Sequence, residues 1–261
     1  MKKLYIDCSM GAAGDMLTGA LLELMPDREA AVARLNAAGI PGIKYEAEDC
    51  VKCGVRGTHV TVTYKGREEL TEDAAGAKAQ DRENGRGHSH KTLFDIEDII
   101  HSLDLPKNVI EDTVGVYEII AEAESIAHGE PVAEVHFHEV GSMDAVADAA
   151  AVCMLMDEIA PDAVIVSDIH VGAGFVKCAH GVLPVPAPAT ANILAGLPAY
   201  GGEVRGELCT PTGAALLKYF GTEFGTAFED SGDKKNARTG RGMGRKDFDR
   251  PNCVTVYLVT E

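Results

Sequence analysis

The sequence predicts a mixed α/β (α+β) fold, in which a mixed β-sheet is flanked by helices and a mobile, acidic and histidine-containing linker interrupts the chain. Residues 163–170 begin with a continuous apolar run, as expected of one central strand buried on both faces. Residues 253–259 alternate like a strand with one buried face. Apolar side chains in residues 92–103 recur with a helical period.

The composition bounds both the architecture and the class of ligand. At 261 residues the chain is long enough for one large domain or two small ones. Hydrophobic residues make up 46% and charged residues 25%, which fits a globular protein with a core. The formal net charge of -17 and the absence of Trp argue against a nucleic-acid partner, and the charge also argues against binding to an anionic membrane surface.

Targeting signals are absent from the sequence as given. No run of about 18 apolar residues predicts a transmembrane helix, and the N-terminus, with an acid at Asp7, lacks the hydrophobic region of a signal peptide. We therefore expect a cytoplasmic protein whose seven cysteines are reduced and mostly buried. Cys50 and Cys53 form a single CxxC pair without the second pair that a structural zinc site needs.

Residues 1–64 are predicted to form an N-terminal part made of a strand, helices and a hairpin. The first strand ends at Asp7, and a turn containing Gly11 and Gly14 leads into a helix. Backbone N–H groups at such a turn can bind an anion. A tight turn that lets the helix pack closely explains the same glycines equally well. Asp7 and Asp15 flank the turn and could hold a metal-bound water.

Residues 65–91 differ in character from the rest of the chain. They carry charge, Gly and Ala with almost no bulky apolar side chain, which predicts a flexible linker. The linker ends in His88 and His90, which either capture a borderline divalent ion or are simply solvated. Residues 92–261 then form the main α/β part, or a single domain together with residues 1–64.

The most informative stretch runs from a predicted strand into a predicted helix. His136 and His138 are two residues apart, so on a strand they share a face. Glu139 follows, and Asp144 and Asp148 then share one side of the helix. Borderline and hard divalent metals take such nitrogen and oxygen ligands. The alternative is a satisfied core histidine, a solvent-facing histidine and two ordinary surface aspartates.

Two later stretches add charged and titratable side chains. A Gly-rich excursion over residues 170–184 brings in His180. Residues 234–250 contain seven basic and two acidic residues within an acidic chain. In this second stretch Arg241, Arg245 and Lys246 are interleaved with Gly, and such a loop can wrap an anionic small molecule.

Several motifs together resemble one known family. They are GAAGDM at 11–16, HFHEVG at 136–141, VGAGFVKCAHG at 171–181, LPVPAPAT at 183–190, TPTGAA at 210–215 and RPN at 250–252. With these motifs the whole chain resembles the LarC family, the nickel insertion proteins that complete the nickel-pincer cofactor of lactate racemase. Members often carry a longer His run in the middle linker, of which only His88 and His90 remain here.

The resemblance implies a reaction and its partners. Ni²⁺ enters pyridinium-3,5-bisthiocarboxylic acid mononucleotide, two Ni–S bonds and one Ni–C bond form, a ring proton is lost and CTP is consumed. The enzyme would be a nickel-inserting lyase (a cyclometallase or nickel chelatase). CTP with Mg²⁺ or Mn²⁺ is expected to bind to a C-terminal LarC portion that this chain does not contain. That portion is an expected partner, lactate racemase is the expected recipient of the cofactor, and a homo-oligomer is expected.

The implied chemistry assigns roles to the residues above. The expected nickel ligands are His136, His138 and Glu139, supported by His88, His90, His180, Asp144 and Asp148. A His or carboxylate beside the metal takes the ring proton, with Glu139 and His138 as the candidates. The substrate phosphate is held by Arg241, Arg245 and Lys246, or by the turn of Gly11 and Gly14.

Two other classes of protein fit the same residues. One is a nickel metallochaperone or scaffold subunit that binds the metal without chemistry of its own. The other is a metal-dependent hydrolase that uses the Asp/His cluster to activate water.

Overall fold

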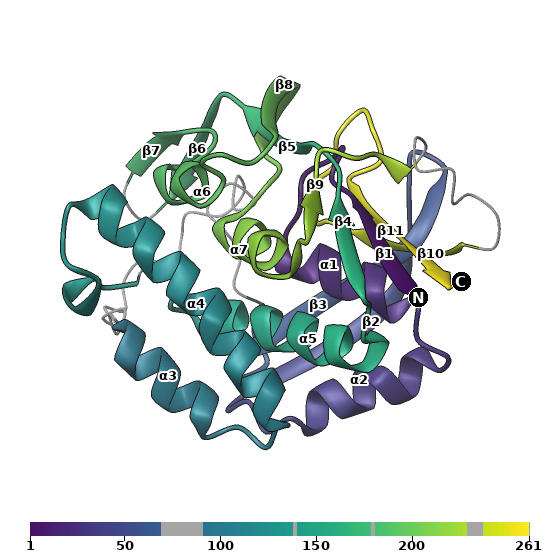
Figure 1. The fold of residues 1–261 in the computed structure, drawn as a ribbon, viewed down its shortest axis with the longest axis horizontal. Helices are drawn as coiled ribbons and strands as arrows, with labels where there is room; N and C mark the ends of the chain where they lie inside the picture. Colours follow the sequence, from purple (N-terminus) through teal and green to yellow (C-terminus); the bar gives the residue numbers. More distant parts are fainter. Residues whose placement is uncertain (69–90, 138–139, 179–180, 229–236, 261) are drawn as a thin grey trace.

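A computed structural model describes residues 1–68, 91–137, 140–178, 181–228 and 237–260, and a seven-stranded sheet lies at its centre (Figure 1). The strands follow the order β2-β3-β10-β11-β1-β4-β9. Their bounds are β1 Lys2–Asp7, β2 Ile43–Lys52, β3 Val55–Tyr64, β4 Ala163–Val166, β9 Glu223–Phe224, β10 Arg238–Met243 and β11 Cys253–Thr260. The N-terminal strand therefore lies beside the C-terminal one.

Both kinds of strand pairing occur in this sheet. β1 runs antiparallel to β11 and parallel to β4, while β10 runs antiparallel to β11 and parallel to β3. This confirms the predicted mixed sheet. The antiparallel hairpin of β2 and β3 comes from residues 1–64 and joins the strands of residues 92–261 through β10.

Helices cover one face of the sheet. α1 contacts β3, β10 and β11, α5 contacts β2 and β3, and α4 and α7 pack against α5. None of the helices in the described ranges is long and apolar enough to cross a membrane. The bounds are α1 Gly14–Leu22, α2 Arg28–Ala37, α3 Leu93–His101, α4 Lys107–His128, α5 Met143–Ile159, α6 Pro188–Ile193 and α7 Pro211–Phe220, with a short 3-10 helix, η1, at Val132–Glu134.

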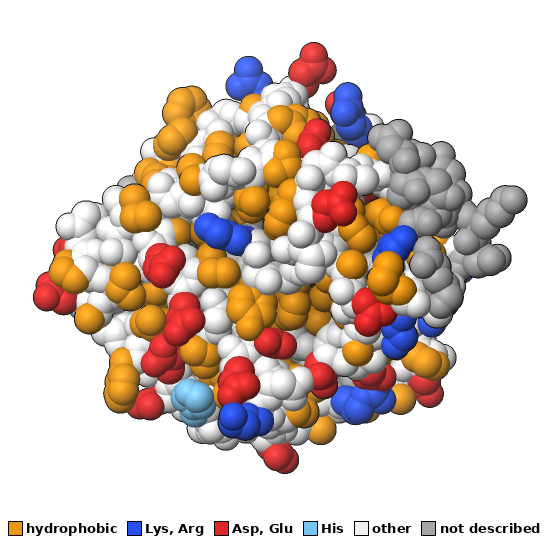
Figure 2. All heavy atoms as spheres, in the orientation of Figure 1, with side chains coloured by type: hydrophobic (Ala, Val, Ile, Leu, Met, Phe, Trp, Pro, Cys, Tyr) orange, Lys and Arg blue, Asp and Glu red, His pale blue; other side chains and the backbone are white. Residues whose placement is uncertain are grey.

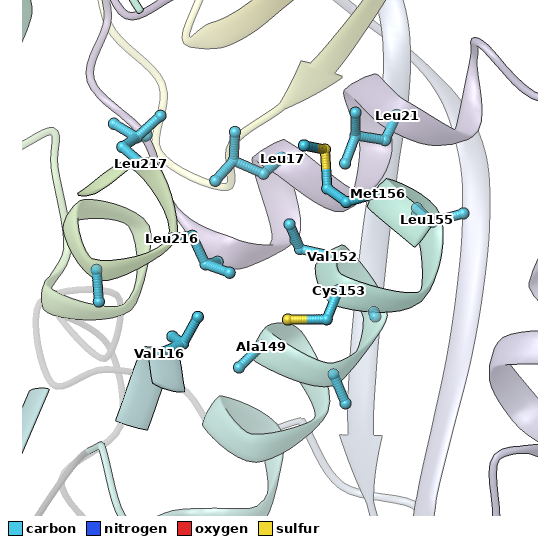
Figure 3. Close-up of a cluster of buried hydrophobic side chains, with 14 of the residues drawn as sticks. Leu17, Leu21, Val116, Ala149, Val152, Cys153, Leu155, Met156, Leu216 and Leu217 are labelled. Atoms are coloured by element: carbon cyan, nitrogen blue, oxygen red, sulfur yellow. The ribbon is translucent and has the colours of Figure 1, made fainter. Parts of the chain in front are cut away.

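The core lies between these helices and the sheet. Figure 3 shows Leu17 of α1, Val152 and Met156 of α5 and Leu216 of α7 converging in one cluster. Each such side chain contributes roughly 1.5–3 kcal/mol when it is fully removed from water. The outer surface differs, because acidic side chains are spread over the face drawn in Figure 2. The core therefore fixes α1 and α5 against the sheet.

Two glycines of β10 let α1 lie directly on the sheet. A Cβ added to Gly242 would lie 1.7 Å from the Met16 carbonyl oxygen, and one added to Gly240 would lie 2.1 Å from the Ala20 carbonyl oxygen. Any side chain at either position would push the helix away. The prediction that the Gly/Arg run forms a loop is wrong at this point, because the alternating glycines serve helix packing within a strand.

The opposite face of the sheet carries its own small cluster. Tyr5, Ile165, Phe228 and Val259 are buried there, and the Phe228 ring stacks on Tyr257 with centroids 4.0 Å apart. Side chains alternate along β10, so Arg241 points to this face while its glycine neighbours face α1. The sheet thus separates a large helical core from a second, smaller side.

Two small sheets follow β4. β5 (Ile169–Ala173) pairs with β8 (Ala199–Glu207), and β6 (Phe175–Cys178) forms a hairpin with β7 (Gly181–Pro184). The predicted buried strand is confirmed over residues 163–166, but its continuation to residue 170 is wrong. The chain leaves the central sheet after Val166, and β4 lies next to the edge strand β9 rather than at the centre.

Most of the other predicted elements are confirmed. The helix predicted to carry Asp144 and Asp148 is α5, and β11 and α3 occupy the stretches that alternation and helical period predicted. Thr210 caps α7 as its side chain accepts a hydrogen bond from the Gly213 N–H at 3.1 Å. Gly129 ends α4 in the left-handed conformation with φ 70°.

Candidate functional site

The loop from β1 to α1 approaches two other segments closely. A Cβ on Gly11, which has φ +74°, would lie 2.1 Å from the Leu208 carbonyl oxygen. A Cβ on Gly14 would lie 2.5 Å from the Cβ of Asp148 and 2.8 Å from its Oδ2. The glycine at the start of α1 therefore lets an α5 carboxylate lie against the positive end of the α1 dipole.

Three carboxylates from α1 and α5, which we call the acid group, act on one another here: Asp15, Asp144 and Asp148. Burial raises the pKa of Asp148 well above its ordinary value, and the charges of Asp15 and Asp144 raise it further. Burial also raises the pKa of Asp15. The Oδ1 of Asp148 is buried, and no described residue donates a hydrogen bond to it. The fold therefore holds these carboxylates together although their negative charges repel one another.

Two basic side chains offset part of this repulsion. The Arg245 guanidinium lowers the pKa of both Asp15 and Asp148, and the His59 ring lowers the pKa of Asp15. Arg245 also pairs with Glu68 at 2.8 Å, and the Nδ1 of His59 lies 2.9 Å from the Met243 carbonyl oxygen. Arg245 therefore lies among carboxylates, where it neutralises charge.

Buried tyrosines hold the backbone around the acid group. The Tyr45 hydroxyl donates to the Ala147 carbonyl oxygen at 2.7 Å, and the Tyr117 hydroxyl donates to the Val140 carbonyl oxygen at 3.0 Å. Ser142 occupies the N-cap position of α5, but its hydroxyl donates to Asp144 rather than capping a backbone N–H. The start of α5 is therefore fixed from the helical core.

Up to residue 137, where the described part of this segment ends, an isolated bridge stands in place of the predicted strand, and buried and exposed residues alternate. Phe137 is 1% exposed and its N–H donates to the Lys91 carbonyl oxygen at 2.8 Å, as an isolated bridge. His136 is exposed and lies close enough to Asp95 to contribute to the lowered pKa of that carboxyl. Lys91 in turn donates to the Gly141 carbonyl oxygen at 2.8 Å. Among the described residues, Lys91 therefore holds this segment at two points, Phe137 and Gly141.

Five of the predicted metal ligands lie outside the described residues: His88, His90, His138, Glu139 and His180. Within the described ranges no group of three or more His, Cys, Asp or Glu side chains is arranged to hold a metal ion. The structure brings Asp144 and Asp148 together with Asp15, and it places His136 at the surface beside α3. The assignment of the nickel ligands stays a prediction.

The predicted phosphate-binding residues are divided between the two sides of the sheet. Arg245 accompanies the acid group, while Arg241 lines a cavity on the opposite face. Lys246 follows Arg245, and its carbonyl oxygen accepts hydrogen bonds from Lys52 and Asn252. The glycines of the turn pack against Leu208 and Asp148, as the close-packing interpretation requires.

Sequence reasoning missed His59, which carries no motif, and it named His170 in the Gly-rich excursion without its contact. The Nδ1–H of His170 donates to the Ser9 carbonyl oxygen at 2.9 Å, and its ring stacks on Tyr200 with centroids 4.7 Å apart. His170 is only 4% exposed. It fixes the loop that follows β1, a contact between distant segments that no local pattern reveals.

Comparisons with known proteins show the family to which the chain belongs. The model of the nickel insertion protein family matches residues 4–261, and the chain belongs to this family. No solved structure matches it.

The curated relatives bear the corresponding names. A pyridinium-3,5-bisthiocarboxylic acid mononucleotide nickel insertion protein from Clostridium kluyveri is 40% identical over 99% of this chain and 62% of its own length. A putative nickel insertion protein from Dictyoglomus thermophilum is 35% identical over 99% of this chain and 61% of its own length. A second pyridinium-3,5-bisthiocarboxylic acid mononucleotide nickel insertion protein, from Desulfitobacterium hafniense, is 37% identical over 99% of this chain and 58% of its own length. The chain thus spans about three fifths of the length of these relatives.

Proposed function

We propose that this chain inserts Ni²⁺ into pyridinium-3,5-bisthiocarboxylic acid mononucleotide and so forms the nickel-pincer cofactor of lactate racemase. The chain belongs to the nickel insertion family. The observation that carries the proposal is its acid group, whose members Asp15 and Asp148 are buried and have raised pKa values. Ni²⁺ is the substrate here, not a resident cofactor. Its ligands must be exchangeable, which suits oxygen and imidazole donors.

The bond changes define what the protein has to supply. Each thiocarboxylate sulfur forms one bond to nickel, and one ring carbon exchanges its proton for nickel, so a base must accept one proton per turnover. A carboxylate whose pKa is raised is a stronger base than an ordinary one. We assign metal delivery to His136, His138 and Glu139 with Asp144 and Asp148 in support, and proton acceptance to Glu139 or His138.

A double variant tests the histidine assignment. His136→Ala with His138→Ala should abolish nickel-dependent product while the melting temperature stays unchanged, because His136 is exposed and makes no part of the core. His101→Ala, an exposed histidine at the end of α3, is the matched control and should keep full turnover. Undiminished product formation in the double variant would end the assignment.

CTP dependence and the lyase class rest on the resemblance to the family. Within the described ranges no set of three ligands for Mg²⁺ or Mn²⁺ occurs, so we route no step through a metal–nucleotide complex on this chain. The curated relatives are longer, and we propose that a part of the protein beyond these residues binds CTP. Assays with and without CTP, on this chain and on a full-length relative, test this. Nickel binding without product under every condition would instead indicate a metallochaperone.

A further inference from the structure

A cavity of about 310 Å³ lies on the sheet face opposite α1. We call it the arginine cavity, and its principal lining residues are Ser9, Val55, Arg241, Arg250, Cys253 and Thr255. The strand register explains how they meet, because Arg241 of β10 lies directly across from Thr255 of β11, and Thr255 lies across from the end of β1. The cavity therefore lies where β10, β11 and the start of β3 meet the segment after β1 and the segment before β11.

Its two guanidinium groups have no partners among the described residues. The side chains of Arg241 and Arg250 make no hydrogen bond and no ion pair there. Arg28 and Arg56 differ from these two, because both pair with Asp49, at 2.8 and 2.6 Å. Together the two guanidinium groups offer ten N–H donors at one cavity of a chain whose net charge is -17.

The remaining groups at the cavity do not cancel this positive charge. Burial is the main cause that raises the pKa of the Cys253 thiol, so it is uncharged at neutral pH. Asp7 contributes one negative charge nearby, but its Oδ1 already accepts the Ser9 N–H at 2.9 Å. Ser9 itself is exposed, and its hydroxyl is free of hydrogen bonds among the described residues. The lining residues themselves include two cations, no carboxylate and one free hydroxyl donor.

From this geometry we propose that the arginine cavity binds the phosphate of the mononucleotide substrate, between Arg241 and Arg250. The inference rests on the proposed function. A phosphomonoester carries close to two negative charges at pH 7 and accepts bidentate hydrogen bonds from guanidinium groups. This assigns a role to Arg250 that no motif indicated, and it separates Arg241 from Arg245, which serves the acid group.

Thiocarboxylates of the same substrate offer similar acceptor chemistry, so the test uses probes that carry one group or the other. The purified chain is titrated with ribose 5-phosphate and with pyridine-3,5-dicarboxylate. We expect Arg241→Gln and Arg250→Gln each to weaken ribose 5-phosphate binding about 10-fold or more. Arg205→Gln, an exposed arginine of β8 outside the cavity, is the control and should change nothing.

The kinetic readout separates this inference from the proposed function. In the nickel-insertion assay, Arg250→Gln should raise KM for the mononucleotide about 10-fold with kcat nearly unchanged. Binding of ribose 5-phosphate through both arginines without any nickel product would overturn the function and keep the phosphate site. Two results would overturn the inference. One is an unchanged ribose 5-phosphate affinity in both folded variants. The other is a cavity whose arginines bind pyridine-3,5-dicarboxylate and not ribose 5-phosphate.

Discussion

The two sides of the central sheet handle charge in opposite ways. On the helical side, Asp15 and Asp148 are drawn together by α1 and α5 although burial and mutual repulsion raise the pKa of Asp148. On the other side, Arg241 and Arg250 line an open cavity without partners in the described residues. The difference suggests that one side is prepared for a cation and the other for an anion.

The same two segments supply both sides. The β1–α1 loop carries Ser9 at the arginine cavity and leads to Asp15 at the acid group, while the chain of β10 carries Arg241 at the cavity and continues to Arg245 beside the acids. Alternation along the strand and the start of one helix therefore divide the charges between the two faces. A substrate that is anionic and must meet a metal fits such a division.

The largest expected effect lies on the acid side. Asp148→Asn or Asp15→Asn should lower nickel-dependent product formation by about 100-fold or more, because each variant removes a charge that balances the metal and the released proton. Product is measured by mass spectrometry after a fixed reaction time. Asp98→Asn, an exposed acid of α3, is the control. Activity within twofold of wild type in both acid variants would remove the acid group from the mechanism.

A change in β10 should disturb both sides at once. Gly242→Ala places a Cβ 1.7 Å from the Met16 carbonyl oxygen, so α1 must shift away from the sheet. We expect a loss of about 3 kcal/mol in the free energy of unfolding, at the upper end of overpacking effects. Urea denaturation gives the value.

Gly201→Ala is the matched glycine control for this change. Its nearest contact would be 3.4 Å away, so it should cost less than about 1 kcal/mol. Equal stability of the two variants would show that α1 does not depend on the close approach to β10.

The pH dependence of stability distinguishes the acid side from an ordinary surface. The folded pKa of Asp148 is raised, so the folded state binds its proton more tightly than the unfolded chain does. The stability held by the protonated form is complete below the unfolded pKa of about 3.9 and is lost as pH rises toward the folded pKa. Asp148→Asn removes this loss.

The variant should therefore be more stable than wild type by about 1–3 kcal/mol at pH 7, the usual penalty for a buried unsatisfied polar group, and the difference should vanish near pH 3. Thermal or urea unfolding between pH 3 and pH 8 measures it. A destabilised variant at pH 7 would mean that the Asp148 carboxylate stabilises the fold, contrary to its raised pKa.

The smallest effect is expected at the arginine cavity. Arg241→Gln should change the free energy of unfolding by less than about 0.5 kcal/mol, because its guanidinium pairs with no described group. Urea denaturation beside Arg28→Gln, which removes the ion pair with Asp49, makes the comparison direct. A larger loss for Arg241→Gln would show a structural role for that guanidinium and weaken the case for a ligand.

The parts of the fold that local patterns encode were predictable. The hairpin of β2 and β3, the helices α3 and α5 and the strand β11 follow from periodicity and turn residues that lie within each element. The alternating Gly and Arg residues of β10 predict a loop, because glycine has low strand propensity. Only the approach of α1, which is distant in sequence, explains Gly240 and Gly242.

In the candidate site, too, the sequence predicts only the features that local spacing encodes. That Asp144 and Asp148 share one side of a helix could be read from their spacing, and the structure brings them together with Asp15. Other features depend on tertiary contacts and have no local signal in the sequence. They are the position of Arg245 among these acids, the contact of His170 with Ser9, and the lack of a partner for Arg250 in the described part of the chain. His136 shares a motif with the acids, yet the structure places it exposed beside Asp95.

The most direct test of the central claim is isothermal titration of Ni²⁺ into the wild-type chain and into Asp148→Asn at pH 7. Zn²⁺ and Co²⁺ are the control ions. Our account predicts that the wild-type chain binds one Ni²⁺ and that Asp148→Asn, although folded and more stable, binds it at least about 10-fold more weakly. Equal nickel affinity in the two chains would contradict the claim that the carboxylates between α1 and α5 belong to the metal-handling site.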